Sequence, residues 1–394
     1  MSEREFCPFV AQLKIEKIIR SLDLEAITRY TDNHKLVAVA ELFDKSNTAV
    51  EAGAGKGPNS LVGALAESVE HYCALQLSSA ESSIQQCDFI SNQHAASHDG
   101  FLTSLRFKNE AIECFKLTTL DRTEDLFIPS LLLRPKLHDQ PRSEAGEAHL
   151  ILGRYSSNSG SAFGCTQAEA LLHGANELIE RHVLSKLFLS ICSLGPSISL
   201  YRPSSALLAR SLQNDPHALG LAEKLQIIVI HSSMNSYFSV ALPKSGPGDF
   251  HLSPIGSGNS LDIQTAIQRA VTEQIQASAF YDAPQEKIDS KTFAFLANSK
   301  SPRHLIDFKP IRALKLPPID EPPAHLTSSV PLQLKTLNNN ITDSGRKLYY
   351  RVITDFPGNG IVCQSYIPGL ERFNIIRNGS LVAPQTILRQ LPAK

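Results

Sequence analysis

Three stretches of this chain share an unusual pattern, in which small residues at helical spacing accompany acid or amide side chains three positions apart. Side chains at i and i+3 lie on one face of a helix, with Cβ atoms roughly 5–6 Å apart, so each pair can direct its oxygens to one point. If the three helices converge, about five carboxylates meet in one pocket. The stretches are ALAESVEHY with Glu67 and Glu70, GANELIERHV with Glu177, Glu180 and Arg181, and RAVTEQIQA with Arg269, Glu273 and Gln276.

A pocket of that kind predicts a bound cation. Carboxylates cannot be packed together without large pKa shifts unless a positive charge neutralises them. Oxygen ligands without His or Cys indicate Mg²⁺, which usually binds together with a phosphate. The third stretch offers one acid and one amide, so we interpret it as a wall of the pocket and not as a third ligand pair.

A single E-x-x-E pair is also typical of a solvated helix face. Here apolar residues at helical spacing flank every pair, which predicts that each helix is buried on at least one side. Glycine-rich stretches, which we interpret as turns, precede the first two helices at 53–57 and 160–164, and a similar stretch at 256–259 precedes the third. The flanking apolar residues are Leu61, Leu65 and Val69; Leu171, Leu178 and Val183; and Ile263, Ile267, Ala270 and Ile275.

The composition of the 394 residues, 42% hydrophobic and 20% charged, is that of a soluble globular protein. A formal net charge of −1 gives no reason to expect binding to nucleic acid or to an anionic membrane. No apolar run approaches the ~18 residues that a membrane-spanning helix needs. The N-terminal sequence MSEREFCPFVAQLKIEK lacks the apolar core of a signal peptide, so we expect a cytoplasmic protein.

Several familiar motifs are absent. The stretch GAGAGKGPNS does not fit the P-loop pattern, because Val50 stands where its first glycine would be and Gly57 follows Lys56. It also fits the dinucleotide-binding glycine pattern poorly. The seven cysteines are scattered and never in C-x-x-C spacing, which disfavours a zinc ribbon or a thioredoxin-type centre. We expect structural roles for His71 and His182, and a buried capping or packing role for Cys165.

Periodicity predicts an α+β fold. Apolar spacing predicts helices over 9–30, 60–80, 166–192, 203–223 and 261–280. Strand-like runs lie at 35–43, 149–156, 225–233, 236–243, 347–356, 360–367 and 372–379. Because several of these strands follow one another directly, mixed or antiparallel sheets are favoured over a regular βαβ winding. We expect an N-terminal extension over 1–45 and one large domain over 46–394, with 281–345 as a peripheral excursion.

The motifs taken together resemble the YcaO family of ATP-dependent enzymes that modify peptide backbones. A glycine-lysine-glycine stretch leads into A-x-E-x-x-E, followed by SAFGCTQAEALLHGANELIER, then R-A-x-x-E-x-x-Q, then YIPGLE near the end. The resemblance covers about residues 50–385 in the family's order. It implies a large domain with an ATP-binding fold that is neither a P-loop nor a kinase fold.

The resemblance also implies roles for individual residues. Glu180, Arg181 and Glu273 would be catalytic. Mg²⁺ ions would be held by Glu67, Glu70, Glu177, Glu180 and Glu273. ATP would be contacted by Lys56, Glu169, Arg181, Arg269 and Gln276. The implied chemistry is activation of an amide: a nucleophile attacks a peptide carbonyl, and ATP phosphorylates the resulting oxygen so that it leaves as phosphate.

This family resemblance leads to a specific expectation about the product. A Cys, Ser or Thr side chain of a ribosomally made precursor peptide would be the nucleophile, giving a thiazoline or oxazoline ring as in microcin or bacteriocin biosynthesis. The alternative is peptide thioamide formation with sulfide and a TfuA-type partner. A second alternative is a non-catalytic scaffold subunit. A scaffold would be expected to have lost the magnesium-facing acids, whereas all five are present in this chain.

Two departures from the family pattern bear on partners and on the C-terminus. About 45 residues precede the first motif, too few for a leader-binding domain, so we expect a separate ThiF-like subunit and, in the same complex, a flavin dehydrogenase. Many azoline-forming relatives end in a proline-rich tail that reaches the active site. This chain ends in RQLPAK, so only Pro392 resembles that tail, and whether Pro392–Lys394 reaches the site is left open.

Overall fold

The computed structural model describes residues 3–31, 33–77, 82–134, 146–320 and 329–390. The tail at Pro392–Lys394 therefore lies outside the described residues. The helices are α1 (Pro8–Ser21), α2 (Ser60–Tyr72), α3 (Cys87–Ser91), α4 (Gly100–Thr103), α5 (Glu147–Leu152), α6 (Gln167–Ile191), α7 (Ser205–Ser211), α8 (Pro216–Ala222), α9 (Ile263–Ala279), α10 (Ala283–Ala297), α11 (Lys309–Arg312), α12 (Val330–Asp343) and α13 (Gln385–Leu388). The strands are β1 (Glu25–Tyr30), β2 (Val37–Phe43), β3 (Ala49–Lys56), β4 (Ser82–Gln86), β5 (Ala111–Thr119), β6 (Asp125–Pro129), β7 (Ser161–Gly164), β8 (Arg202–Pro203), β9 (Leu225–His231), β10 (Tyr237–Pro243), β11 (Gly256–Ser260), β12 (Pro318–Ile319), β13 (Tyr349–Phe356) and β14 (Gly360–Tyr366).

Helices and strands mix in an α+β arrangement, which confirms the predicted class. The six-stranded sheet has the order β4-β5-β13-β14-β7, with β6 paired to β5. Two three-stranded sheets, β1-β2-β3 and β11-β10-β9, are antiparallel, and β12 pairs β8 in parallel. In the described part of the chain, no helix is both long enough and apolar enough to cross a membrane.

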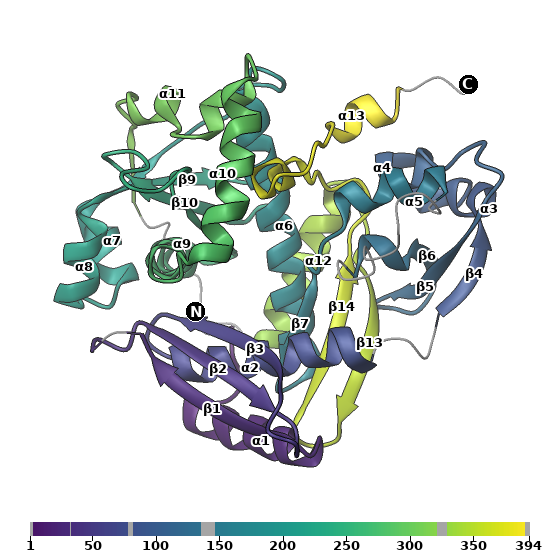
Figure 1. Cartoon of the computed structure of the whole chain (residues 1–394), viewed down its shortest axis with the longest axis horizontal. Coiled ribbons are helices and arrows are strands. Elements are labelled where there is room, and N and C mark those ends of the chain that lie inside the picture. Colours follow the sequence, from purple (N-terminus) through teal and green to yellow (C-terminus); the bar gives the residue numbers. More distant parts are fainter. Residues whose placement is uncertain (1–2, 32, 78–81, 135–145, 321–328, 391–394) are drawn as a thin grey trace.

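Helix α6 occupies the centre of the molecule, where it packs against β14 and β7 of the six-stranded sheet and against β11 of one three-stranded sheet (Figure 1). Its first turn is capped by the Thr166 side chain, which accepts a hydrogen bond from the backbone N–H of Glu169 at 3.3 Å. Apolar residues occur on most of its faces, so the largest core cluster forms around it. The segment over 281–345, which we expected to be peripheral, contributes Leu296, Leu334 and Leu337 to that cluster.

The glycine-rich stretches that precede α2, α6 and α9 lie mainly in strands, not in turns as predicted. Gly53 and Gly55 belong to β3, and Gly256 and Gly258 belong to β11. A Cβ atom on Gly55 would lie 1.6 Å from the carbonyl oxygen of Ser60, and one on Gly256 would lie 2.1 Å from the backbone nitrogen of residue 274. These glycines therefore let the backbone of each helix rest directly against its strand.

We expect replacement of Gly256 by alanine to destabilise the fold by ~3 kcal/mol or more, because the added methyl group overlaps the backbone of α9 and packed interiors cannot absorb such a change without backbone shifts. The matched control is Gly220→Ala on α8, where an added Cβ meets nothing within 4 Å. Alanine favours helix there, so this variant should be as stable as the wild type or slightly more so. Urea denaturation of both variants tests the prediction, and equal midpoints would contradict it.

Secondary structure differs from expectation in several places. The single helix predicted over 203–223 is two short helices, α7 and α8, and the Asp215 side chain caps the start of the second. The helix predicted over 9–30 ends at Ser21, because residues 25–30 pair with β2 as strand β1. The predicted strand 149–156 is instead helix α5 followed by a short 3-10 turn; the carboxylate of Glu110 accepts hydrogen bonds from the N–H groups of Glu147 and Ala148 and stabilises the helix start. The predicted strand 372–379 is a 3-10 helix over Phe373–Asn378 that packs on α6.

The predicted boundary at residue 45 falls inside one sheet. Strands β1 and β2 come from the segment 1–45, and β2 pairs along its whole length with β3, which begins at Ala49. Helix α1 contributes Ile15, Ile18 and Ile19 to the same core cluster as α2. The N-terminal residues are thus packed together with the first acid-bearing helix.

Candidate active site

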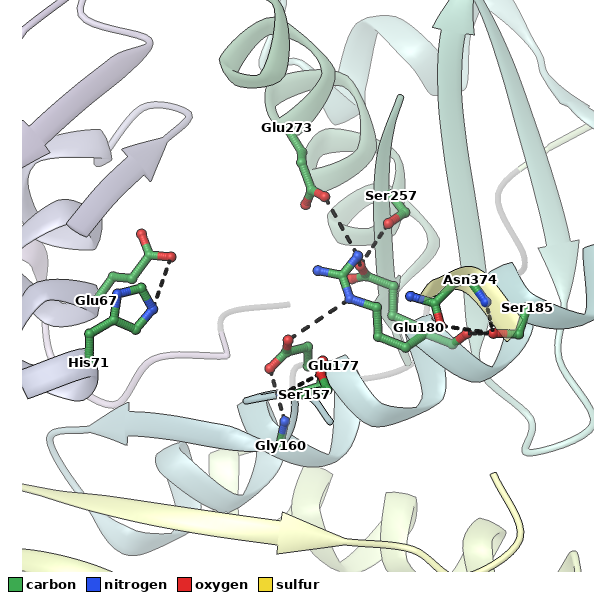
Figure 2. Close-up of polar contacts among 12 residues, drawn as sticks. Glu67, His71, Ser157, Gly160, Glu177, Glu180, Ser185, Ser257, Glu273 and Asn374 are labelled. Atoms are coloured by element: carbon green, nitrogen blue, oxygen red, sulfur yellow. Dashed lines mark hydrogen bonds and ion pairs between the residues drawn. The ribbon is translucent and has the colours of Figure 1, made fainter. Parts of the chain in front are cut away.

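A pocket of about 630 Å³ opens where α2, α6 and α9 approach one another. The N-terminal segment and the end of β3 complete its wall. Figure 2 shows Glu67 on α2 facing Glu177, Glu180 and Glu273 across this opening. The pocket brings together all the residues that the sequence singled out as candidates: Lys56, Glu67, Glu70, Glu169, Glu177, Glu180, Arg181, Arg269, Glu273 and Gln276.

Backbone N–H groups hold three of the carboxylates in place. Glu67 accepts a hydrogen bond from Ala54 in β3 at 2.6 Å, and Glu70 accepts one from Phe163 in β7 at 3.0 Å. Glu177 accepts one from Gly160 at 3.2 Å. Each bond uses one oxygen of the carboxylate and fixes its direction. The strands that the glycines bring against the helices therefore also orient the acids.

Arg181 and Lys56 offset part of the negative charge. The Arg181 guanidinium lies 3.4 Å from a carboxylate oxygen of Glu180, and 4.0 Å from oxygens of both Glu177 and Glu273. The ammonium of Lys56 forms an ion pair with Glu273. Glu180, only 7% exposed, also accepts a hydrogen bond at 2.7 Å from the Ser257 hydroxyl in β11. Two cations from different elements thus connect three acids.

Burial, and to a smaller extent the neighbouring acids, disfavour the ionised form of three of these carboxyl groups, as their raised pKa values show. Burial raises the pKa of Glu70 well above its ordinary range, and neighbouring Glu177 and Glu67 raise it further. Burial also raises the pKa values of Glu177 and Glu180, although Arg181 opposes the shift in both. For Glu273, burial acts in the same direction, but Lys56 and Arg181 outweigh it and the pKa is lowered. The pocket therefore favours an additional cation.

The donor set fits Mg²⁺ that binds together with a phosphate. Within the described ranges, no three His, Cys, Asp or Glu side chains lie close enough to bind a metal ion by themselves. Mg²⁺ in nucleotide sites usually takes one or two carboxylates and completes its octahedron with phosphate oxygens and water. Acid pairs on facing helices, with Arg181 and Lys56 in the same pocket, match that mode of binding.

Two charged residues near the N-terminus belong to this site and were not predicted. The Glu3 carboxylate lies 2.6 Å from the Arg269 guanidinium, and Arg4 lies 2.9 Å from Glu169. Arg269 also donates to the carbonyl oxygen of Asn259 at 2.9 Å. No local pattern marks Glu3 or Arg4, because their partners are more than 160 residues away in the sequence.

The remaining sequence candidates have structural contacts. Burial lowers the pKa of His182 to about 3, and its Nδ1 accepts a hydrogen bond from the backbone N–H of Glu371. Burial raises the pKa of Cys165 to about 11, so its thiol is not activated and the predicted packing role is confirmed. His71 lines the pocket, with Nδ1 at 3.1 Å from the carbonyl oxygen of Ala52.

Several solved structures share the fold of this chain. A heterocyclase determined with substrate and cofactor superposes with a TM-score of 0.64 at 18% identity, over 94% of this chain. This chain spans 54%, about half, of that heterocyclase chain. YcaO from Methanopyrus kandleri, determined with AMPPCP and Mg²⁺, gives a TM-score of 0.62 at 16% identity and covers 94% of this chain and 93% of its own. The E. coli microcin synthetase McbBCD complex gives 0.53 at 13% identity, covering 87% and 86%.

These likenesses show that the fold is that of the YcaO proteins. Residues 53–371 match the family described as YcaO cyclodehydratase, ATP- and Mg²⁺-binding. The chain belongs to the YcaO family. None of the curated proteins matches the sequence. The family description names the two cofactors for which the pocket chemistry argues, ATP and Mg²⁺.

Proposed function

We propose that this protein is an ATP- and Mg²⁺-dependent cyclodehydratase, which converts Cys, Ser or Thr residues of a ribosomally made precursor peptide to thiazoline or oxazoline rings. One observation carries the proposal: three carboxyl groups with raised pKa values line a nucleotide-sized pocket in which Arg181 and Lys56 supply only part of the balancing charge. Membership of the YcaO cyclodehydratase family supports the choice of reaction.

The residues of the pocket divide into two groups in this proposal. Mg²⁺ would be held by Glu67 and Glu70 on α2, by Glu177 and Glu180 on α6, and by Glu273 on α9. The nucleotide would be bound by Lys56, Glu169, Arg181, Arg269 and Gln276. Bound ATP would supply the phosphoryl group for the amide oxygen after the Cys, Ser or Thr side chain has attacked the amide carbon. The oxygen would then leave as phosphate, with ADP as the other product, and the peptide would lose the mass of one water as the ring forms.

The catalytic residues in this scheme are Glu180, Arg181 and Glu273. Arg181 lies between the other two and can stabilise negative charge that develops on a transferring phosphoryl group. Glu180 and Glu273 fix the guanidinium and direct it into the pocket. Because these contacts already exist without a ligand, little reorganisation is needed when the nucleotide binds.

We further propose that the enzyme works in the cytoplasm, in a complex with a separate ThiF-like subunit that binds the precursor peptide, and with a flavin dehydrogenase. The likeness to the E. coli microcin synthetase McbBCD complex supports an assembly of several subunits. A purely structural role is disfavoured, because a scaffold subunit would not need to keep five carboxylates on one pocket.

The deciding experiment incubates the protein with ATP, Mg²⁺, a precursor peptide and partner proteins encoded by neighbouring genes, and follows the peptide by mass spectrometry. We expect loss of the mass of one water per modified residue. Exchange of oxygen for sulfur in the presence of sulfide and a TfuA-type partner would instead establish thioamide formation. If Mg·ATP neither binds nor raises the melting temperature, the enzymatic proposal is wrong.

A further inference from the structure

Strand β1 is an edge strand whose side chains are all exposed. It ends the sheet β1-β2-β3, and in the described part of the chain it pairs only with β2. All of its residues, Glu25–Tyr30, are exposed, and Figure 1 shows the strand at the periphery of the molecule. The edge strand β9 of the other three-stranded sheet is different. It is mostly buried, and its Val229 exchanges backbone hydrogen bonds with Tyr201.

Alternate residues of β1 form the hydrogen bonds to β2, and the others direct their backbone groups away from it. The N–H of Thr31 donates to the carbonyl oxygen of Val37 at 3.0 Å, and the register of the two strands has the same offset along all of β1. In an antiparallel ladder, the hydrogen-bonded residues alternate with residues that face the other way. The N–H and C=O groups of Ala26, Thr28 and Tyr30 therefore point to the free edge.

The free edge of β1 lacks the usual protection against another strand. Natural proteins protect such edges with a proline, a bulge, repelling charges or a covering helix. The sequence of β1, EAITRY, contains no proline, and its register with β2 has no bulge. Its two charged residues, Glu25 and Arg29, have opposite signs, so two copies of the strand need not repel each other. An added strand would supply partners for the outward-facing backbone groups.

The side chains of β1 match those of a second β1 that runs antiparallel to it. Glu25, Ile27 and Arg29 lie on one face of the strand, because side chains alternate. A copy centred on Ile27 places Ile27 against Ile27 and Glu25 of each chain directly opposite Arg29 of the other. Directly opposite Cβ atoms are roughly 4.5–5.5 Å apart, which is close enough for two ion pairs. In the same register Ala26 lies opposite Thr28, so the outward-facing backbone groups exchange hydrogen bonds.

We propose that β1 is the contact surface of a homodimer, in which two copies of this chain join their β1-β2-β3 sheets edge to edge about a twofold axis between the two Ile27 side chains. A twofold interface requires one self-complementary patch, and this strand is such a patch. Strand β3 of the same sheet ends at Lys56 in the active-site pocket, so the continuous sheet connects the pocket walls of the two protomers. Because one short strand is a small interface, association should be reversible and concentration-dependent.

Sedimentation velocity over a concentration series measures dimerisation of the full chain and of charge-reversed variants. Glu25→Arg and Arg29→Glu should each weaken dimerisation ~10-fold or more, because each puts like charges opposite each other at two places. The double variant with both changes restores opposite charges and should dimerise as the wild type does. The matched control is Glu223→Arg, an exposed position at the end of α8, which should leave dimerisation unchanged.

A substitution at Thr28 tests the backbone contact separately. Thr28→Pro removes an N–H group that points to the free edge and that β2 does not use, and proline is tolerated at such positions of edge strands. We expect this variant to remain folded, as its melting temperature will report, and to lose dimerisation. Its control, Thr28→Ala, keeps the N–H group and should dimerise within a few fold of the wild type.

The outcomes distinguish a second copy from other occupants of the edge. A wild-type chain that stays monomeric at every concentration would overturn the proposal, and so would a dimer that none of these variants weakens. Failure of the double variant to restore dimerisation would contradict the pairing of Glu25 with Arg29. If the chain is monomeric and the charge-reversed variants instead lose binding to a partner subunit, a segment of that subunit occupies the edge and the homodimer is wrong. Dimerisation is measured without nucleotide or peptide, so failure of the proposed enzymatic activity would not affect the test.

Discussion

Replacement of Glu180 by glutamine is expected to abolish ATP-dependent turnover and to leave the fold intact. Glutamine has the same shape, and its amide oxygen can still accept the hydrogen bond that Ser257 donates at 2.7 Å. What the variant loses is the negative charge beside Arg181, and with it a ligand for Mg²⁺. Since metal-assisted charge stabilisation is worth several kcal/mol, we expect turnover to fall ~10³-fold or more.

Phosphate release and peptide mass report turnover of the Glu180→Gln variant, and calorimetry with Mg·ATP reports its binding. Glu223→Gln on the exposed end of α8 makes the same chemical change away from the pocket and should have wild-type activity. The melting temperature of the free variant should be at least that of the wild type, because the replaced carboxyl group has a raised pKa and is unfavourable when ionised. Unchanged turnover would show that the metal site is assigned to the wrong residues.

The pocket itself could be predicted from the sequence because its main determinants are local. Within each of the pairs Glu67–Glu70 and Glu177–Glu180, the two side chains lie on the same face of their helix as soon as that helix forms, independently of the rest of the chain. The apolar residues beside them determine which side of α2, α6 and α9 is buried. Helix periodicity was therefore sufficient to predict on which helix faces the acids lie, and the structure brings those faces to one pocket.

The groups that complete the pocket could not be predicted in the same way. Ser257, which donates to Glu180, lies 77 residues away in the sequence, and Glu3 reaches Arg269 over 266 residues. Neither residue stands in a periodic pattern. His173, which also lines the pocket, did have a local signal, because it lies on the same face of α6 as Glu169 and Glu177, four residues from each. Contacts of this kind depend on the tertiary fold.

The glycines show why strands were harder to recognise than helices. Gly53, Gly55, Gly256 and Gly258 lower the strand propensity of their segments, so a sequence pattern favours turns. Their role becomes clear only from the backbone of α2 and α9, which comes too close for any Cβ. Similarly, the 149–156 run has strand composition, yet Glu110 from a distant position stabilises it as a helix.

Replacement of Arg181 by alanine is expected to destabilise the free protein in a strongly pH-dependent way. Its guanidinium lies 3.4–4.0 Å from oxygens of Glu177, Glu180 and Glu273. In the variant these three carboxylates lose that cation, and only Glu273 keeps the ion pair with Lys56 that the described structure shows. Removing one partner of a buried ion pair can cost ~3–5 kcal/mol, and partial exposure of this cluster reduces the expected loss to ~1–3 kcal/mol at pH 8. Turnover should fall below detection.

The sign of the pH dependence follows from the direction of the shifts. Glu177 and Glu180 have pKa values raised above the ordinary 4.5, and Arg181 holds both down. Without Arg181 they rise further, so the folded variant keeps protons that the unfolded chain has already released. Stability is then lost as the pH increases through the raised pKa values. Glu273 changes in the same sense, because loss of Arg181 weakens the pairing that keeps its pKa low. The difference in melting temperature between variant and wild type should therefore grow from pH 5 to pH 8.

The double variant Arg181→Ala, Glu180→Gln separates this explanation from simple loss of packing. If uncompensated charge causes the destabilisation, removal of one carboxylate should restore much of the stability at pH 8 and change little at pH 5. Mg²⁺ alone should also stabilise the single variant more than the wild type, since the ion can replace the missing positive charge. A loss of stability that is the same at both pH values, and that neither Glu180→Gln nor Mg²⁺ relieves, would mean that Arg181 supports the pocket through its bulk and not through its charge.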